Sequence, residues 1–161
     1  MAARDGNGWV QCRCGSRHWG LHGAAGLLLH RHGPAHGEVL MQLRAPWVHQ
    51  GSTWAAPGGA ADSHEDAVTA ALREAEEEAG VRPAQVSVLG LLTSVDHGDW
   101  TYHMVLACSR AQYLAVRGNS ESDEMRWVAL EAVERLSLHP GFAASWPTVR
   151  STLVRLLAAQ A

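Results

Sequence analysis

Four of the 16 acidic residues stand close together beside Arg73: Glu74, Glu76, Glu77 and Glu78. On a helix, Glu74, Glu77 and Glu78 would converge on one side at positions i, i+3 and i+4, and Glu76 would fall on the other flank. Like charges at this spacing repel, so a positive charge is expected among them. Grouped carboxylates suit Mg²⁺ or Mn²⁺, which binds a few carboxylates together with water and phosphate. A solvated acidic face is the alternative.

The flanking sequence predicts the helix that would hold these carboxylates. Asp62 or Ser63 can cap its N-terminus, with an acidic residue three positions later. Gly80 suits the left-handed residue beyond its C-terminus, and Pro83 prevents continuation. At about 100° per residue, one narrow buried stripe collects the apolar positions. That stripe contains Val68, Ala71, Leu72, Ala75 and Ala79.

The complete pattern resembles the Nudix box, G-x5-E-x7-R-E-U-x-E-E-x-G-U, where U is aliphatic. It starts at Gly59, continues at Glu65 and ends in REAEEEAGV at 73–81. Every fixed glycine and polar position is filled, and Ala75 stands where the family usually has a larger aliphatic residue. Nine specified positions at fixed spacing form a specific signal, which makes the solvated acidic face the weaker interpretation.

The resemblance implies an α/β fold, a Nudix-type α/β/α sandwich with a central mixed β-sheet. It implies a Mg²⁺-dependent (or Mn²⁺-dependent) hydrolase that cleaves a phosphoanhydride in a small nucleotide. The expected metal ligands are Gly59, Glu74, Glu77 and Glu78. The expected catalytic residues are Arg73, Glu74, Glu77 and Glu121. Arg44, which ends a predicted strand on its polar side, and Glu65, which in the family acts beside the metal, are the expected substrate-binding residues.

Glu121 enters this set through its spacing. It lies in a polar stretch, 117–123, six residues before Trp127. In MutT-type members of the family, a loop glutamate at that spacing binds a metal or acts as the base. Glu124 competes for the same role, and a solvated loop carboxylate is the alternative for either residue.

Hydrophobic patterning predicts the elements of residues 21–161, which we interpret as the Nudix domain, with 1–20 as an N-terminal extension. Strands are expected at 24–30, 38–44, 85–95, 100–109 and 125–129. A brief helix is expected at 130–136, and the segment 138–146 should lead into an amphipathic helix that ends near Leu157.

The extension contains Cys12, Cys14, His18 and His22. Zinc is a possible reading, but these residues lack the paired C-x2-C and H-x3-5-H spacing of closed zinc sites. The favoured interpretation is a short hairpin around Gly15, with two tryptophans, Trp9 and Trp19, packed on the edge of the domain.

Several aromatic residues could border a nucleotide base. Trp47 and Trp54 could stack on one, although packing in the core or loop is the more common role. His139, Phe142 and Trp146 could form a wall of the base pocket.

Length and composition limit the other classes of function. The 161 residues carry a net charge of −3 and 13 basic residues, with no basic cluster, which argues against a nucleic-acid polymer as partner. Three cysteines and no leader indicate a cytoplasmic protein without a disulfide framework. The longest apolar stretch, 24–29, is too short to cross a membrane. A homodimer stays open, since such dimers are common in the family.

The MutT-like character favours removal of oxidised guanine nucleotides, 8-oxo-dGTP or 8-oxo-dGDP. Hydrolysis of ADP-ribose or a dinucleoside polyphosphate is the alternative, although the proline or tyrosine typical of those enzymes is absent from 90–100. A non-catalytic Nudix-fold ligand sensor is a further alternative, but such proteins usually lose box carboxylates.

Overall fold

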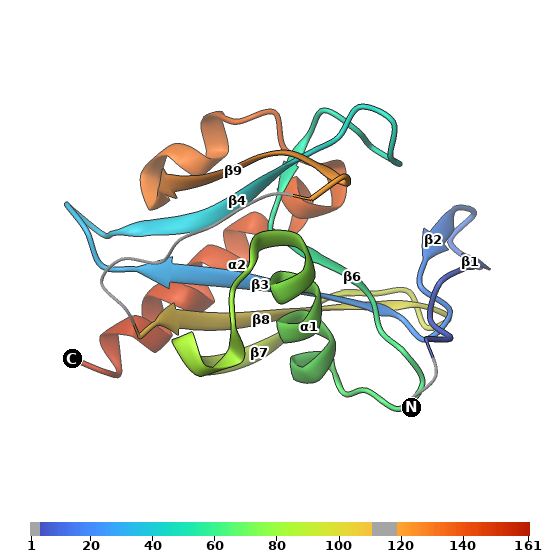
Figure 1. Cartoon of the computed structure of the whole chain (residues 1–161), viewed down its shortest axis with the longest axis horizontal. Helices are drawn as coiled ribbons and strands as arrows, with labels where there is room; N and C mark the ends of the chain where they lie inside the picture. The colour runs from blue at the N-terminus through green and yellow to red at the C-terminus, as the bar shows by residue number, and fades with distance from the viewer. Residues whose placement is uncertain (1–3, 111–118) are drawn as a thin grey trace.

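Seven strands form one mixed sheet in the computed structural model, which describes residues 4–110 and 119–161 (Figure 1). They are β3 (Ala24–Arg31), β4 (Glu38–Arg44), β5 (Trp54–Ala55), β6 (Gly58–Ala60), β7 (Val86–Asp96), β8 (Thr101–Ser109) and β9 (Ser122–Ala129). The order is β5-β4-β3-β8-β7, with β6 beside β3 and β9 beside β4. β3 and β8 run parallel, whereas the other pairs are antiparallel.

One helix covers each face of this sheet: α1 (Ala67–Ala79) lies on one side and α2 (Pro140–Ala158) on the other (Figure 1). The sequence of β3 explains this, because a strand buried on both faces is apolar without alternation. Leu27 and Leu29 point into the cluster under α1, and Leu28 points into the cluster under α2. The predicted α/β/α sandwich with a central mixed sheet is confirmed.

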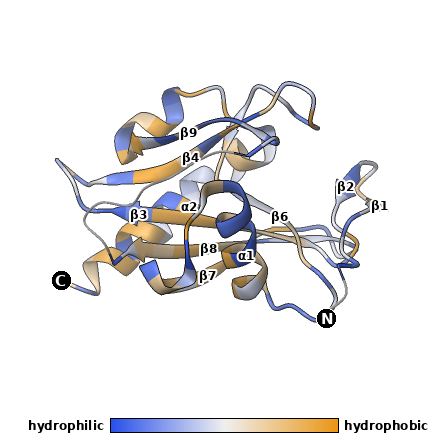
Figure 2. Cartoon of the chain, in the orientation of Figure 1, coloured by the Kyte–Doolittle hydropathy of each residue, from blue (hydrophilic) through white to orange (hydrophobic). Residues whose placement is uncertain are grey.

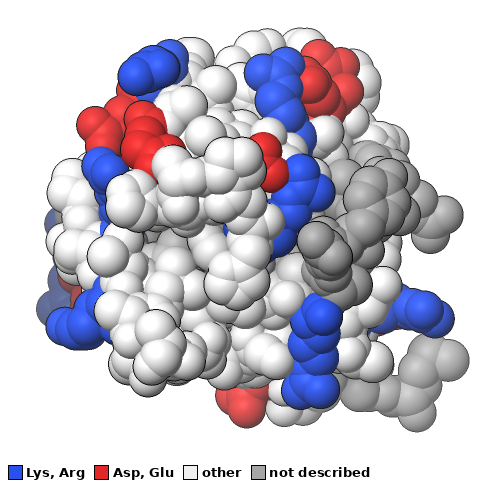
Figure 3. Space-filling view, turned by 90° about the vertical axis from the view of Figure 1, so that its left-hand side faces the viewer, with Lys and Arg blue, Asp and Glu red and all other residues white. Residues whose placement is uncertain are grey.

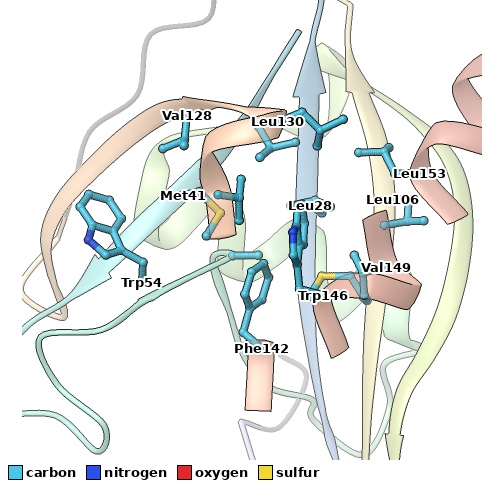
Figure 4. Close-up of a cluster of buried hydrophobic side chains, with 14 residues drawn as sticks. Leu28, Met41, Trp54, Leu106, Val128, Leu130, Phe142, Trp146, Val149 and Leu153 are labelled. Carbon is cyan, nitrogen blue, oxygen red and sulfur yellow. The ribbon is translucent and has the colours of Figure 1, made fainter. Parts of the chain in front are cut away.

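The buried tryptophan and phenylalanine side chains of the described residues, Trp54, Trp146 and Phe142, lie under α2. Phe142, Trp146, Val149 and Leu153 of α2 pack in one cluster with Leu28 and other strand residues (Figure 4). Under α1 the helix contributes mainly alanines, which bring it close to the sheet. Figure 2 shows the result as hydrophobic colour along β3, β4 and β8 and hydrophilic colour on much of α1.

The neighbouring strands β3 and β4 pair over only two positions, His30 with Val39 and Arg31 with Glu38. Beyond these positions, β6 pairs with β3, and β5 pairs with β4. The two central strands therefore separate at one end of the sheet. The glycine-containing strand β6 and the polar end of β4 lie at this separation.

Helix α1 begins later than predicted. Its N-cap is Asp66, whose Oδ1 accepts the Thr69 N–H at 2.8 Å. The predicted caps, Asp62 and Ser63, belong to the preceding turn, because the Asp62 N–H donates to Glu65 Oε1 at 2.8 Å. The predicted end is confirmed: Gly80 is left-handed, with φ of 69°.

The buried face of α1 includes Ala71, Ala75 and Ala79 of the predicted stripe and extends to residues outside it. Ala70 and Glu78 are buried, whereas Val68 and Leu72 are only half-buried. The reason is that α1 packs closely against the glycines of β6, so the side of the helix that bears Glu78 faces protein rather than solvent.

The remaining boundaries differ little from the predictions. Strand β9 begins at Ser122, so the end of the polar stretch is already strand, and residues 117 and 118 lie outside the described residues. The brief helix is a 3-10 turn, Leu130–Arg135. The segment predicted to lead into the last helix is mostly helical, because Pro140 occupies its first turn and His139 Nδ1 accepts the Gly141 N–H at 3.0 Å.

The N-terminal hairpin is present, with strands β1 (Trp9–Gln11) and β2 (Arg17–Trp19) in a separate two-stranded sheet. Trp9 and Trp19 meet edge to face, with ring centroids 5.2 Å apart. The hairpin lies beside the ends of β7 and β8 (Figure 1), where Trp100 Nε1 donates to the Trp19 carbonyl at 3.2 Å. The division of the chain at residue 20 stays a prediction.

Charge is dispersed over the face shown in Figure 3, where arginine side chains are interspersed with acidic ones. In the described part of the chain, no helix is long and apolar enough to span a membrane.

Candidate active site

A cavity of about 360 Å³, here called the acidic hollow, lies where β3 and β4 separate. Three box carboxylates and the box glycine line it: Glu74, Glu77, Glu78 and Gly59. Arg44 and Glu121, predicted from separate parts of the sequence, line it as well. Glu76 is exposed and lines no part of it, as the helical arrangement predicts.

Glu78 is the most buried carboxylate of the hollow, with 4% of its surface exposed. Its Oε2 accepts the Gly58 N–H at 3.0 Å. Burial raises the pKa of Glu78 to about 8, and the nearby charges of Glu74 and Glu121 add to this rise. The Gly58 hydrogen bond and the Arg44 charge offset only part of the effect. The site therefore holds a carboxylate that lacks a close compensating cation.

Glu74 lies directly against the backbone of β6. A methyl group built on Gly59 would meet the Glu74 carboxyl carbon at 2.5 Å, so only glycine leaves room for this carboxylate. Burial raises the pKa of Glu74, although its hydrogen bond to Arg73 opposes the rise. This contact places the Glu74 carboxylate against the backbone of β6.

Arg73 lies behind the hollow and joins the predicted residues into one network. Its Nη1 donates to Glu74 Oε1 at 2.8 Å, and its Nη2 donates to the Ala60 carbonyl at 2.9 Å. Its Nε and Nη2 form a bidentate pair with Glu65 at 2.8 and 2.9 Å. This geometry fixes the Glu74 carboxylate from one side.

Glu65 does not line the acidic hollow. Its side chain is 3% exposed, both its oxygens are hydrogen-bonded to Arg73, and Oε1 also accepts the Asp62 N–H. The Arg73 hydrogen bond lowers the pKa of Glu65. In this structure Glu65 therefore contacts the residues that position Glu74, and its predicted contact with substrate stays a prediction.

Glu77 is the most accessible of the three box carboxylates, with 40% of its side chain exposed. Arg4 donates to Glu77 Oε1 at 3.0 Å, and Asn119 donates to the Glu77 carbonyl at 3.4 Å. The N-terminal segment and the residues before β9 thus both reach this helix.

The polar end of β4 supplies the opposite wall. Arg44 donates from Nε and Nη2 to the His49 carbonyl, at 3.1 and 2.9 Å, which anchors its guanidinium at the hollow. Gln42 lies two positions earlier on the same face and donates to Ser122 Oγ at 2.5 Å. Its Oε1 is buried and has no hydrogen-bond partner among the described residues.

Glu121 and Glu124 have different surroundings. Glu121 lines the hollow, and its backbone N–H donates to Asn119 Oδ1 at 3.0 Å. Glu124 pairs with Arg126 at 2.8 Å and lines no part of the hollow. The geometry therefore favours Glu121 over Glu124.

A second cavity, of about 670 Å³, adjoins the hollow and is here called the aromatic cleft. Both cavities share Arg44, His49, Gly58, Gly59 and the two hairpin tryptophans. The other rings of the cleft come from distant segments: His18, His97, Trp100, Tyr102, His139 and Phe142. A flat group bound in the cleft could thus be attached to a charged group in the hollow.

Rings in the cleft are held by stacking and burial. His18 stacks on Trp100, with centroids 4.5 Å apart and an interplanar angle of 16°. Burial lowers the pKa of His139 to about 4, so its imidazole is neutral. Burial also raises the pKa of the Tyr102 hydroxyl. Neutral rings of this kind suit the base of a nucleotide.

The predicted aromatic contacts are realised in part. His139 and Phe142 line the cleft, whereas Trp146 is 2% exposed and lies in the core. Trp54 is also a core residue, and Arg126 lies over its ring. Trp47 is 73% exposed and lines neither cavity. It therefore matches neither predicted role, stacking on a base or packing in the core or loop.

Comparison with known proteins agrees with this geometry. The family description "NUDIX domain" matches residues 20–150, which is most of the chain. The chain belongs to the Nudix family. The box therefore corresponds to the β6–α1 segment that supplies the acidic hollow.

Two relatives share much of the sequence. A Mycobacterium tuberculosis protein described as "Putative 8-oxo-dGTP diphosphatase 3" is 46% identical over 153 residues, covering 91% of this chain and 70% of the relative. A fusion protein of Bifidobacterium longum, a nucleoside triphosphate pyrophosphatase joined to a Nudix hydrolase, is 39% identical over 162 residues. That match covers 98% of this chain and 33% of the fusion protein.

Two solved structures support the fold. RenU, a Nudix hydrolase from M. smegmatis, has 47% identity and a TM-score of 0.87, with 93% of this chain and 96% of that chain covered. A C. elegans Ap4A hydrolase has 22% identity and a TM-score of 0.68, covering 81% and 98% of the two chains. The similarity to the C. elegans protein concerns the fold alone.

The sequence prediction missed several residues that line the two cavities of this Nudix protein. Gln42 could have been found, because the alternation of β4 places it on the same face as Arg44. Asn119, His18 and Trp100 carry no such signal, since only the tertiary fold brings their segments together. His97, which follows β7, also lines the cleft.

Proposed function

We propose that this Nudix hydrolase cleaves the phosphoanhydride of a nucleoside di- or triphosphate with Mg²⁺, and that oxidised guanine nucleotides, 8-oxo-dGTP or 8-oxo-dGDP, are its preferred substrates. One observation carries the proposal: the carboxylate-lined hollow opens beside a cleft lined by aromatic rings. The relative from M. tuberculosis, 46% identical, supports the choice of base.

The donors of the hollow fit a hard divalent cation. Glu74, Glu77 and Glu78 offer carboxylate oxygens, and Gly59 offers a carbonyl, whereas no thiol or imidazole is needed. Glu78 is buried with a backbone N–H as its hydrogen-bond donor. The ionised form of a buried carboxylate with only this donor is strongly stabilised by a bound cation. We therefore propose these four residues as the ligands of Mg²⁺, with Mn²⁺ as a substitute.

When bound, the cation would neutralise phosphate charge and lower the pKa of a water molecule. Glu77 and Glu121 are the candidates to accept a proton from that water, because both line the hollow and Glu77 is partly exposed. Arg44 would bind a substrate phosphate from the opposite wall. Arg73 would act by positioning Glu74, and Glu65 by positioning Arg73.

The aromatic cleft would bind the base. Stacking on rings tolerates any base, so selectivity for oxidised guanine needs polar groups at its edge. Hydrolysis of ADP-ribose or a dinucleoside polyphosphate is the competing function, since the cleft at about 670 Å³ could also take a larger second group. A cytoplasmic location and a homodimer stay predictions.

The first test is a panel of substrates with Mg²⁺: 8-oxo-dGTP, 8-oxo-dGDP, dGTP, the other dNTPs, ADP-ribose and a dinucleoside polyphosphate. Each is measured with wild type, Glu78→Gln and Glu76→Gln. Both variants replace one carboxyl group of α1 by an amide, but only Glu78 lines the hollow. We expect kcat/KM to fall at least about 10³-fold in Glu78→Gln and to change less than about twofold in Glu76→Gln.

The outcomes separate the alternatives. Preference for an 8-oxo nucleotide that is lost in Glu78→Gln supports the proposal. Preference for ADP-ribose or a dinucleotide would keep the metal site and overturn the choice of substrate. Absence of turnover on the whole panel, with ligand binding retained, would favour a non-catalytic Nudix-fold sensor.

A further inference from the structure

The N-terminal hairpin contains a second cluster of metal-binding side chains, separate from the acidic hollow. Ligand atoms of Cys12, Cys14 and His18 all lie within 4.8 Å of one another. His18 Nε2 is 3.1 Å from Cys14 Sγ, and the Cys14 N–H lies 3.4 Å from Cys12 Sγ. Two sulfurs and one imidazole nitrogen thus converge without any rearrangement of the chain.

The strand register explains how a short sequence brings these groups together. Val10 pairs with His18 across the hairpin, so their side chains share one face. Cys12 lies two positions after Val10 and therefore points to the same face. The turn then returns Cys14 toward this face: the Gly15 N–H donates to the Cys12 carbonyl at 3.1 Å, and Gly15 has φ of 93°.

We propose that Cys12, Cys14 and His18 bind one Zn²⁺, with a fourth coordination position open to water. Thiolate and imidazole are the ligands that zinc prefers, and they suit Mg²⁺ poorly. Three protein ligands with one open position is an established zinc arrangement. The spacing C-x-C-x3-H does not match closed zinc motifs, but the hairpin register supplies the convergence that those spacings normally provide.

The hairpin is fixed to the domain at both sides of the cluster, which favours a preformed site. The Arg13 N–H and Nε donate to the Asp99 carboxylate at 2.9 to 3.1 Å. His18 stacks on Trp100, which itself donates to the Trp19 carbonyl. Cys12 is buried, whereas Cys14 is exposed, so an ion could reach the cluster from solvent.

Zinc bound by these three residues would be held by a residue that forms part of one wall of the aromatic cleft. His18 lines the cleft, as do Trp9 and Trp19 at the far end of the same hairpin. A bound ion would tie the turn of the hairpin to this wall. The zinc site itself does not depend on the proposed reaction, and its test uses metal binding rather than turnover.

The test is a Zn²⁺ titration of the full chain, reduced with TCEP, in the presence of excess Mg²⁺ to occupy the carboxylates of the hollow. Stoichiometry is read by a competing chromophoric chelator, and Co²⁺ replaces Zn²⁺ for absorption spectra. Four variants are compared with wild type: Cys12→Ser, Cys14→Ser, Cys108→Ser and Glu78→Gln. Cys108 is the matched control, because it is a buried thiol on β8 near His30 rather than in the hairpin.

We expect one tightly bound Zn²⁺ and a sulfur-to-cobalt charge-transfer band in wild type, Cys108→Ser and Glu78→Gln. Both should be lost in Cys12→Ser and Cys14→Ser. Added Zn²⁺ should also raise the melting temperature of wild type and Cys108→Ser but not of the two hairpin variants. Equal binding by all variants, loss in Glu78→Gln alone, or the absence of a thiolate band would overturn the proposal.

Discussion

The acidic hollow and the aromatic cleft share a border, yet they are built in different ways. The hollow takes three of its carboxylates from one helix, with Gly59 a few residues before it. The rings of the cleft come from the N-terminal hairpin, the β7–β8 turn and the start of α2. Most carboxylates of the hollow are therefore encoded by one segment of the sequence, whereas the rings of the cleft are brought together only by tertiary contacts.

This difference separates chemistry from selectivity. A change in the hollow alters the charge available to the phosphates, and the same chemistry serves every nucleotide. A change in the cleft alters only the group that binds beside them. We therefore expect variants of the hollow to lower kcat for all substrates, and variants of the cleft to change KM and the ranking of substrates.

Glu121 and Glu124 give the sharpest test within the hollow. Glu121→Gln should lower kcat about 10²-fold, because its carboxylate lines the cavity and is a candidate base. Glu124→Gln removes the same charge three residues later, where it pairs with Arg126, and should leave kcat within about twofold. Steady-state kinetics at saturating Mg²⁺ measure both. The reverse ranking would assign the loop position to Glu124.

Arg73 tests whether orientation of Glu74 matters apart from its presence. Arg73→Ala should lower kcat about 10- to 100-fold and weaken the apparent Mg²⁺ affinity, while KM for the nucleotide changes little. Arg73→Lys should recover only part of this, since an ammonium cannot reproduce the fork on Glu65 and Glu74.

The control for Arg73 is Arg126→Ala, which removes an arginine that lines neither cavity. Circular dichroism must show both variants folded at the assay temperature. If Arg73→Ala raised KM and left kcat and the Mg²⁺ dependence unchanged, Arg73 would bind substrate rather than position a ligand.

The sequence was sufficient to group the carboxylates of α1, because their signal is contiguous. The box predicts that Glu74, Glu77 and Glu78 share a side, and the spacing to Trp127 identifies Glu121. Burial was not predictable in the same way. The helical pattern assigned Val68 and Leu72 to the core, and both are half-buried against it, but the pattern did not predict that close packing on the β6 glycines also buries Glu78. Only the structure shows that the Glu78 carboxylate is buried.

The cleft could be predicted from the sequence only in part. The stretch 138–146 suggested a base pocket, and His139 and Phe142 do line it, but Trp146 on the same helix faces the core. The N-terminal hairpin was predicted as an edge element. Its role as a wall depends on contacts between Arg13 and Asp99 and between Trp100 and Trp19, which no local pattern encodes.

Trp9 tests the contribution of the hairpin to binding. Trp9 lines both cavities and meets Trp19 and His49 edge to face at 5.2 Å. Trp9→Ala should raise KM about tenfold with little change in kcat, as expected for the loss of one ring contact to a base. Trp47→Ala removes an equal ring from an exposed position and should leave both constants unchanged. Equal effects of the two changes would exclude a specific role for the hairpin.

The smallest expected effect concerns stability in the absence of divalent cations. Burial raises the pKa of Glu78 to about 8 from 4.5 in the unfolded chain. Below about pH 4.5 both states hold the proton, so Glu78 does not oppose folding; as pH rises toward about 8, the unfolded chain loses its proton first and the unfolding free energy falls. The melting temperature of wild type should therefore fall relative to Glu78→Gln across this range, and Glu76→Gln, altered at an exposed position, should follow wild type.

Added Mg²⁺ should reverse this loss in wild type and have less effect on Glu78→Gln, because the cation stabilises the ionised carboxylate only in the folded chain. Thermal melts at several pH values, with EDTA or Mg²⁺, measure both effects. If wild type and Glu78→Gln gave parallel curves with EDTA, Glu78 would already be ionised in the folded chain. The affinity of the hollow for a cation would then arise from repulsion among its carboxylates rather than from the burial of one of them.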